Sequence, residues 1–168
     1  MVRRPFVVDV ASLRRHAGNR RREQRQAPVT GLAISGSRVP DGGEVGVDVM
    51  LEALHGGAVM VEGGVTAPWE GDCRRCLGPA SGSLTMAVRE LFETGSDEEE
   101  TYRLEDDRID LEPLVRDAVL LELPQAPVCA EACQGLCPTC GINRNEGTCQ
   151  CEPTSRDPRW AALDQLKE

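Results

Sequence analysis

Eight cysteines, arranged in four close pairs, constrain this 168-residue chain more than any other feature. Six of them lie within 23 residues of a segment that has few apolar side chains besides cysteine. The pairs are Cys73 and Cys76, Cys129 and Cys133, Cys137 and Cys140, and Cys149 and Cys151. A short spacer lets two thiolates bind one metal ion, and zinc prefers four such ligands in a tetrahedron. The spacing therefore predicts two structural zinc ions, without which residues 127–152 have no fold.

Two other cysteine chemistries compete with zinc. Disulfides within the pairs would close very small, strained loops. Each disulfide would contribute about 2–4 kcal/mol, against about 10–16 kcal/mol for a structural zinc. The alternative function is a thiol-based redox sensor or oxidoreductase that uses the CxxC pairs. Neither CxxC pair opens a helix of a thioredoxin-like unit, so the zinc interpretation is favoured.

Which pairs share a metal ion is left open by the spacing. One grouping joins Cys137, Cys140, Cys149 and Cys151 in a local knuckle, and brings Cys129 and Cys133 to Cys73 and Cys76. The other grouping joins Cys129, Cys133, Cys137 and Cys140, and sends Cys149 and Cys151 back to Cys73 and Cys76. The first grouping is favoured, because all but one of its loop closures are short.

Charge is distributed unevenly along the chain. The formal net charge is −9, but residues 1–30 hold eight arginines and two acidic residues, a charge of +6 that leaves −15 for the rest. An exposed basic arm is a candidate RNA-binding element. Its candidate residues are Arg14, Arg15, Arg20, Arg21, Arg22 and Arg25. The acidic body should repel phosphate, which favours a basic protein as its partner, and the acidic run 93–107 is expected to be an exposed loop.

Apolar periodicity predicts an α+β fold. Apolar residues alternate over 45–51, 59–67 and 84–92, with glycines between the first two segments, so we expect an antiparallel β meander or partly closed barrel. Residues 110–123 form an amphipathic pattern that ends at Pro124, which predicts one helix covering the sheet. Asp157 and Pro158 begin a predicted short terminal helix.

Four regions follow from these patterns. Residues 1–43 are expected to form a basic strand and helix arm with an irregular linker, and residues 44–126 the sheet with helix 110–123. Residues 127–152 form the cysteine-rich zinc segment, and residues 153–168 the terminal helix. An apolar patch interrupted by Asp9 argues against a secretory signal and a membrane span, so we expect a reducing cytoplasm. The alternative for the arginine-rich start is an organellar transit peptide.

Four ordered motifs resemble those of a known family. They are DCRRCL at residues 72–77, IDLEPLVRDAVLLELPQAPVC at 109–129, CQGLCPTCGINRNEGTCQC at 133–151 and DPRWAALDQL at 157–166. Together they resemble the YceD-type large ribosomal RNA subunit accumulation proteins of bacteria and plastids. The resemblance covers roughly residues 69–166, and one departure is Arg144, where the family's knuckle usually has leucine.

The resemblance implies a non-catalytic factor for synthesis, processing or stability of the large-subunit 23S rRNA. It implies no enzymatic activity and no small-molecule substrate, and it groups Cys73 and Cys76 with Cys129 and Cys133. The implied partners are large-subunit ribosomal components, either the rRNA or a basic ribosomal protein.

Overall fold

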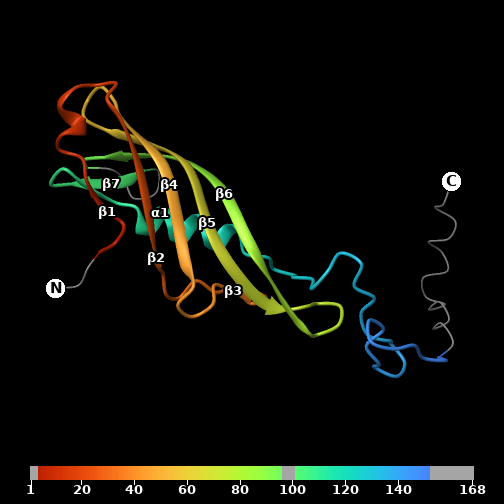
Figure 1. The fold of residues 1–168 in the computed structure, drawn as a ribbon. Coiled ribbons are helices and arrows are strands. Elements are labelled where there is room, and N and C mark those ends of the chain that lie inside the picture. Colours follow the sequence, from red (N-terminus) through yellow and green to blue (C-terminus); the bar gives the residue numbers. More distant parts are fainter. Residues whose placement is uncertain (1–3, 96–100, 152–168) are drawn as a thin grey trace, which may run out of the picture.

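The structure is a computed structural model that describes residues 4–95 and 101–151. Its described part forms eight strands, a short 3-10 helix η1 and one α-helix (Figure 1). The elements are β1 (Val7–Asp9), η1 (Leu13–Arg15), β2 (Arg20–Pro28), β3 (Ser37–Arg38), β4 (Glu44–Ala53), β5 (Val59–Asp72), β6 (Pro79–Glu93), β7 (Tyr102–Glu105), β8 (Arg108–Asp110) and α1 (Glu112–Glu122). The predicted terminal helix at 153–168 lies outside the described residues.

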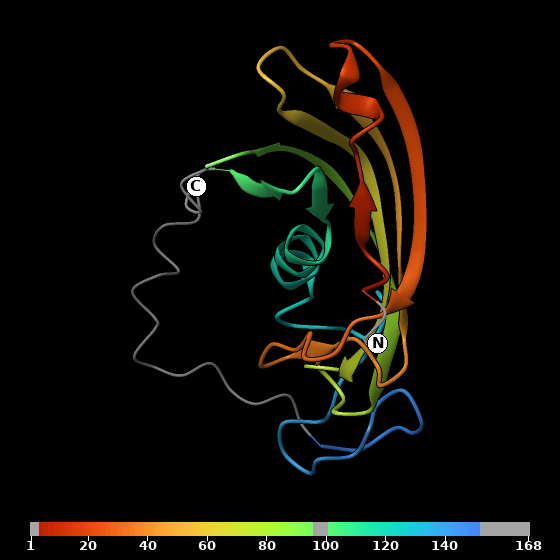
Figure 2. The ribbon, with the colours of Figure 1, turned by 90° about the vertical axis from the view of Figure 1, so that its left-hand side faces the viewer.

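The strands form one curled sheet whose concave side holds α1, as the end-on view in Figure 2 shows. The strand order is β1-β8-β7-β6-β5-β4-β2, with β3 paired to β5. All pairings are antiparallel except the parallel pairing of β6 with β7. The expected partly closed barrel with one covering helix is therefore confirmed, although the sheet is mixed rather than purely antiparallel.

The central meander β4-β5-β6 follows from the apolar alternation of the sequence. Val45, Val47, Val49 and Leu51 of β4 are buried, while the residues between them face outward. Gly56 and Gly57 both have positive φ angles, +86° and +87°, which a tight β4–β5 turn requires and which side-chain-bearing residues rarely adopt.

Helix α1 packs its apolar stripe into the concave face of the sheet. Its buried residues are Leu114, Val115 and Val119, and Leu111 just before it is buried as well. Just before the helix, the Asp110 Oδ1 accepts a hydrogen bond from the Glu112 N–H at 3.0 Å. The helix ends before Pro124, which cannot continue a helical hydrogen-bond ladder.

The expected irregular linker within residues 1–43 is wrong over residues 20–28. This segment forms β2, which pairs with β4 along its whole length. The positions of β2 on the same parity as buried Ala27 are the half-buried Arg21, Glu23 and Arg25, so the strand lacks apolar alternation. Arg21 and Arg25 form ion pairs with the same Glu23 at 2.8 and 2.9 Å, which compensates part of the positive charge on this face.

The expected exposed loop at 93–107 is also wrong in part. Residues 102–105 form β7, and residues 108–110 form β8, joined by a turn in which Asp106 and Asp107 have positive φ angles. β8 then pairs with the edge strand β1, so the acidic run supplies β7 and leads into the β1 edge of the sheet. Aspartate tolerates this backbone conformation better than most residues, which suits an acidic sequence to the turn.

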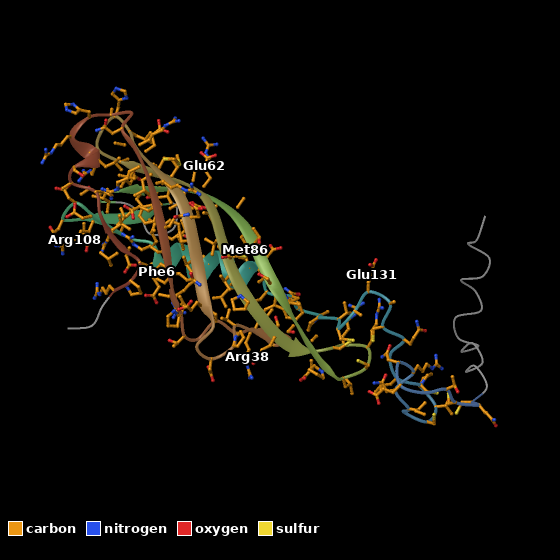
Figure 3. All side chains as sticks on the ribbon, viewed as in Figure 1. Phe6, Arg38, Glu62, Met86, Arg108 and Glu131 are labelled. Carbon is orange, nitrogen blue, oxygen red and sulfur yellow. The ribbon has the colours of Figure 1, made fainter. Side chains whose placement is uncertain are left out.

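The cysteine-rich segment lies beyond the end of the sheet at which the β5–β6 turn lies, away from the β7–β8 turn. Figure 3 shows Arg108 at one end of the molecule and Glu131 in the segment that leaves the other end. Within described residues 124–151, the backbone forms turns and a single isolated bridge between Leu136 and Asn143. Its start is fixed by the buried Ser37, whose hydroxyl donates to the Pro124 carbonyl at 2.9 Å.

Candidate metal centres

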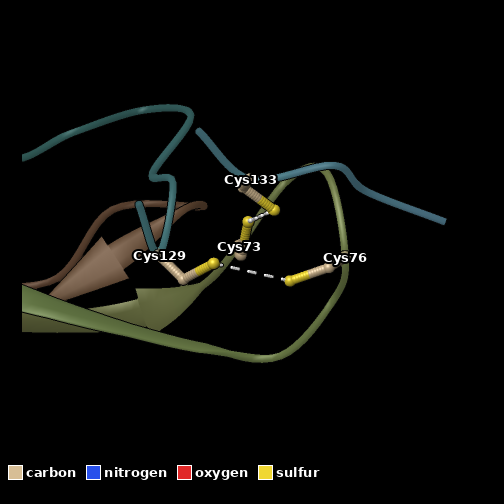
Figure 4. A group of neighbouring side chains, drawn as sticks. All are labelled: Cys73, Cys76, Cys129 and Cys133. Carbon is tan, nitrogen blue, oxygen red and sulfur yellow. Dashed lines mark hydrogen bonds between the residues drawn. The ribbon is translucent and has the colours of Figure 1, made fainter. Parts of the chain in front are cut away.

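The first four-cysteine cluster, tetrad 1, joins the tip of the β5–β6 hairpin to the chain that follows α1. It consists of Cys73, Cys76, Cys129 and Cys133, whose Sγ atoms all lie within 4.8 Å of one another (Figure 4). Two sulfur–sulfur distances are 3.8 Å, between Cys73 and Cys133, and 3.6 Å, between Cys76 and Cys129. Ligands about 2.3 Å from a tetrahedral zinc ion lie roughly 3.8 Å apart, so the spacing fits zinc.

Backbone hydrogen bonds and one positive φ angle shape the hairpin tip. The Cys73 N–H donates to the Gly78 carbonyl at 2.7 Å, and the Leu77 N–H donates to the Cys73 carbonyl at 2.8 Å. Leu77 has a φ angle of +59°, unusual for a residue with a side chain, and this turns the chain back toward β6. Both cysteines of the CRRC sequence therefore face one point.

The two arginines between these cysteines hold the other half of tetrad 1. The Arg74 N–H donates to the Pro127 carbonyl at 2.9 Å. The Arg75 guanidinium donates to the carbonyls of Glu131 and Cys133, at 2.8 and 3.2 Å. Sequence reasoning missed this positioning role, because no motif predicts which carbonyl groups a surface arginine will contact.

The second four-cysteine cluster, tetrad 2, is local to the knuckle. It consists of Cys137, Cys140, Cys149 and Cys151, and its Sγ atoms also lie within 4.8 Å of one another. The Gly141 N–H donates to the Cys137 carbonyl at 2.9 Å, and Gly141 has a φ angle of +75°. The structure therefore brings the cysteines together in the first of the two groupings that the spacing allowed.

In each tetrad, backbone hydrogen bonds lower the pKa of the first cysteine in the sequence. The backbone amide of Cys129 is the largest influence that lowers the pKa of Cys73 to about 6. The amides of Cys140 and Thr139 lower the pKa of Cys137 to about 5.

One later thiol in each tetrad has a strongly raised pKa. Contacts with the Cys133 and Cys76 sulfurs raise the pKa of Cys129 to about 12, and contact with the Cys140 sulfur raises the pKa of Cys151 to about 12. Four thiolates cannot share such a small volume unless a cation balances them. A divalent metal ion supplies that charge and releases protons as it binds.

The arginines predicted to bind RNA are mostly paired within the fold. Arg20 pairs with Glu52 at 2.8 Å, and Arg22 pairs with Asp48 at 2.5 Å across the β2–β4 ladder. As described above, Arg21 and Arg25 pair with Glu23. The structure thus brings four of the six candidates into one strand, but as partners of carboxylates.

The other two candidate arginines lie in η1. Arg14 donates to the Gly57 carbonyl at 2.6 Å and pairs with Asp107, so it links the β4–β5 turn to the β7–β8 turn. Arg15 is exposed, and within the described part of the chain its side chain forms no hydrogen bond or ion pair. A freely moving basic arm is therefore not what residues 14–25 form.

Comparison with known proteins agrees with the motifs. A family model described as large ribosomal RNA subunit accumulation protein YceD matches residues 61–167. An uncharacterised protein of Mycobacterium tuberculosis is 36% identical over 175 residues, which cover 96% of this chain and 81% of that protein. An uncharacterised protein of Bacillus subtilis is 29% identical over 99 residues, which cover 56% of this chain and 58% of that protein.

A plant relative carries the family's descriptive name. The chloroplastic homolog 1 of large ribosomal RNA subunit accumulation protein YCED from Arabidopsis thaliana is 37% identical over 60 residues, 36% of this chain and 19% of that protein. No solved structure matches the chain. Among the described residues, no helix is long and apolar enough to cross a membrane. The family match covers well over half of the chain, and the chain therefore belongs to the YceD family of large ribosomal RNA subunit accumulation proteins.

Proposed function

We propose that this chain is a non-catalytic, cytoplasmic factor needed for synthesis, processing or stability of the large-subunit 23S rRNA. The observation that carries the proposal is a pair of complete four-cysteine clusters in a member of a family named for accumulation of this RNA. All eight cysteines belong to these clusters, which supports a structural role for the thiols over a redox role.

In this proposal, each tetrad binds one structural zinc ion. A set of four thiolates is typical of closed structural sites, in which no coordination position remains for substrate. Zinc would act only by fixing the chain around it. Tetrad 1 would join the hairpin tip to residues 129–133, and tetrad 2 would give shape to a knuckle with few apolar residues of its own.

Charge supports a basic ribosomal protein as the direct partner. Four thiolates and one Zn²⁺ carry −2, so two loaded sites change the formal charge of −9 to −13. Such a body repels phosphate and attracts basic surfaces. The pairing of Arg20, Arg21, Arg22 and Arg25 with carboxylates weakens the case for direct rRNA binding by this strand.

Deletion and complementation test the proposed function. A strain lacking the gene should contain less 23S rRNA relative to 16S rRNA, and the wild-type gene should restore the ratio. Replacing both Cys73 and Cys133 with serine should prevent restoration, whereas Thr85→Ala, a change at an exposed position of β6, should restore it. An unchanged rRNA ratio in the deletion strain would contradict the proposal.

Affinity capture from nuclease-treated lysate separates the two partner classes. A basic ribosomal protein should remain bound after the RNA has been digested. Loss of every ribosomal protein after digestion would favour direct rRNA binding. In that case, replacing Arg20, Arg21, Arg22 and Arg25 with glutamine should flatten the salt dependence of binding to the rRNA.

A further inference from the structure

A short segment joins the two tetrads and forms backbone hydrogen bonds with residues near each of them. Only residues 134–136 separate Cys133 of tetrad 1 from Cys137 of tetrad 2. On one side, the Leu136 N–H donates to the Arg75 carbonyl of the hairpin tip at 2.9 Å. On the other side, the Arg144 N–H of the knuckle donates to the Gly135 carbonyl at 2.9 Å. The linker is therefore hydrogen-bonded to structure from each site.

Asn145 connects the knuckle to a sulfur atom of the other tetrad. It lies in the loop between Cys140 and Cys149, yet its side-chain amide donates to the Cys133 Sγ at 3.4 Å. Its side-chain oxygen accepts a hydrogen bond from the Gln134 N–H at 2.8 Å. A residue of the knuckle loop thus contacts a ligand sulfur of the other tetrad.

The position of Asn145 depends on the fold of the knuckle loop. The Asn143 side-chain oxygen accepts hydrogen bonds from both the backbone and side-chain N–H groups of Asn145, at 3.1 and 2.8 Å. Asn143 in turn donates to Glu146 at 2.7 Å. These contacts form within the loop between Cys140 and Cys149. Metal binding that closes this loop at tetrad 2 would therefore hold the Asn145 amide beside the Cys133 Sγ.

We propose that Asn145 couples the two metal sites, so that metal in tetrad 2 strengthens metal binding at tetrad 1. The coupling is reciprocal, because binding free energies at linked sites affect each other equally. Asn145 is a positioning residue, since it contacts a ligand rather than the metal. The inference rests on the proposed function in one respect, namely that both tetrads bind metal.

The test measures zinc affinity in the full chain by competition with a chelator of known affinity. Amide NMR signals of Ala132 and Thr139 report tetrads 1 and 2 separately. We expect Asn145→Ala to weaken zinc binding at tetrad 1 by about 10- to 100-fold, the usual effect of losing a hydrogen bond to a metal ligand. Asn145→Asp, which keeps an oxygen for the Gln134 N–H but loses the donor, should weaken it at least as much. Thr148→Ala, at an exposed position in the same loop, should leave both affinities unchanged.

A double-mutant cycle distinguishes coupling from a local effect. Replacing Cys137 and Cys140 with serine disables tetrad 2 and should weaken tetrad 1 by a similar factor. Adding Asn145→Ala to that variant should then change little. If wild-type protein binds two zinc ions and Asn145→Ala releases them with wild-type affinities, the coupling is refuted while the metal sites stand. If wild-type protein binds no zinc, both the coupling and the zinc part of the proposed function fail.

Discussion

Cys73 and Cys133 are separated by 60 positions in the sequence, yet their Sγ atoms lie 3.8 Å apart. Cys73 follows β5 at the tip of a hairpin, whereas Cys133 belongs to the chain that leaves α1. A metal ion at this point would fasten the cysteine-rich segment to the end of the half-barrel, which is the curled sheet with α1 on its concave side. A metal ion in tetrad 1 would therefore join the β5–β6 turn to the chain after α1, whereas one in tetrad 2 would give the knuckle its shape.

Arg14 should be a structural residue rather than an RNA-binding one. Arg14→Ala removes hydrogen bonds to the Gly57 carbonyl and to Asp107, and we expect the free energy of unfolding to fall by about 1–3 kcal/mol. Arg15→Ala is the matched control, because Arg15 is the exposed neighbour, and should change stability by less than about 0.5 kcal/mol. Equal urea denaturation midpoints for the two variants would contradict the role of Arg14.

The sequence predicts those parts of the fold that apolar periodicity or cysteine spacing specifies. The meander and α1 follow from apolar alternation and from a helical stripe. β2 could not be found this way, because Arg21, Glu23 and Arg25 occupy the positions where apolar residues would signal a strand. The ion pairs that make these charges tolerable form only in the folded strand.

A similar limit applies to the acidic run and to the site. β7 and β8 lie among acidic residues and owe their pairing to β6 and β1, which no local pattern reveals. The spacing of the cysteines predicted metal ligands and left two groupings, which the long-range path of the chain decides. Asn145 and Arg75 carry no sequence signal, because their contacts depend on where other backbone groups lie.

Gly135 should be required by a close approach as well as by its backbone conformation. Its φ angle is +69°, and a Cβ atom there would lie 3.0 Å from the Arg75 carbonyl oxygen. Gly141 has a similar φ angle of +75° but no atom within 4 Å of a Cβ position, so Gly141→Ala is the matched control.

Gly135→Ala should therefore lower the urea concentration at which zinc is released by more than Gly141→Ala does. The additional loss of stability is expected to be about 1 kcal/mol, since crowding usually costs about 1–3 kcal/mol. If the two variants released zinc at the same urea concentration, the contact with Arg75 would have no energetic importance.

Asp48 should ionise at an unusually low pH. Hydrogen bonds from Arg22 and Gln24 lower the pKa of Asp48 to about 2. Because the folded pKa lies below the unfolded value of about 3.9, the pair stabilises the fold fully above that unfolded pKa. This contribution is lost as the pH falls toward 2. Carboxyl NMR titration should show the low pKa in wild type and a higher one in Arg22→Gln, and an Asp48 that titrates normally in wild type would refute the pair.

Metal removal should unfold the cysteine-rich segment but leave the half-barrel folded. The half-barrel has its own apolar core, whereas Cys73, Cys76, Ala80 and Cys133 form a separate small cluster. A zinc chelator should therefore preserve the strand signal in circular dichroism while trypsin cleavage after Arg144 accelerates. Loss of the strand signal together with the metal would mean that the sheet depends on zinc, contrary to this account.

Counting metal ions by native mass spectrometry tests the central claim most directly. The wild-type chain should carry two zinc ions and no disulfides. Replacing Cys73, Cys76, Cys129 and Cys133 with serine together should leave one zinc ion, because the four ligands of tetrad 2 remain. A wild-type chain without zinc, or a four-serine variant that binds none, would contradict the two sites as the structure groups them.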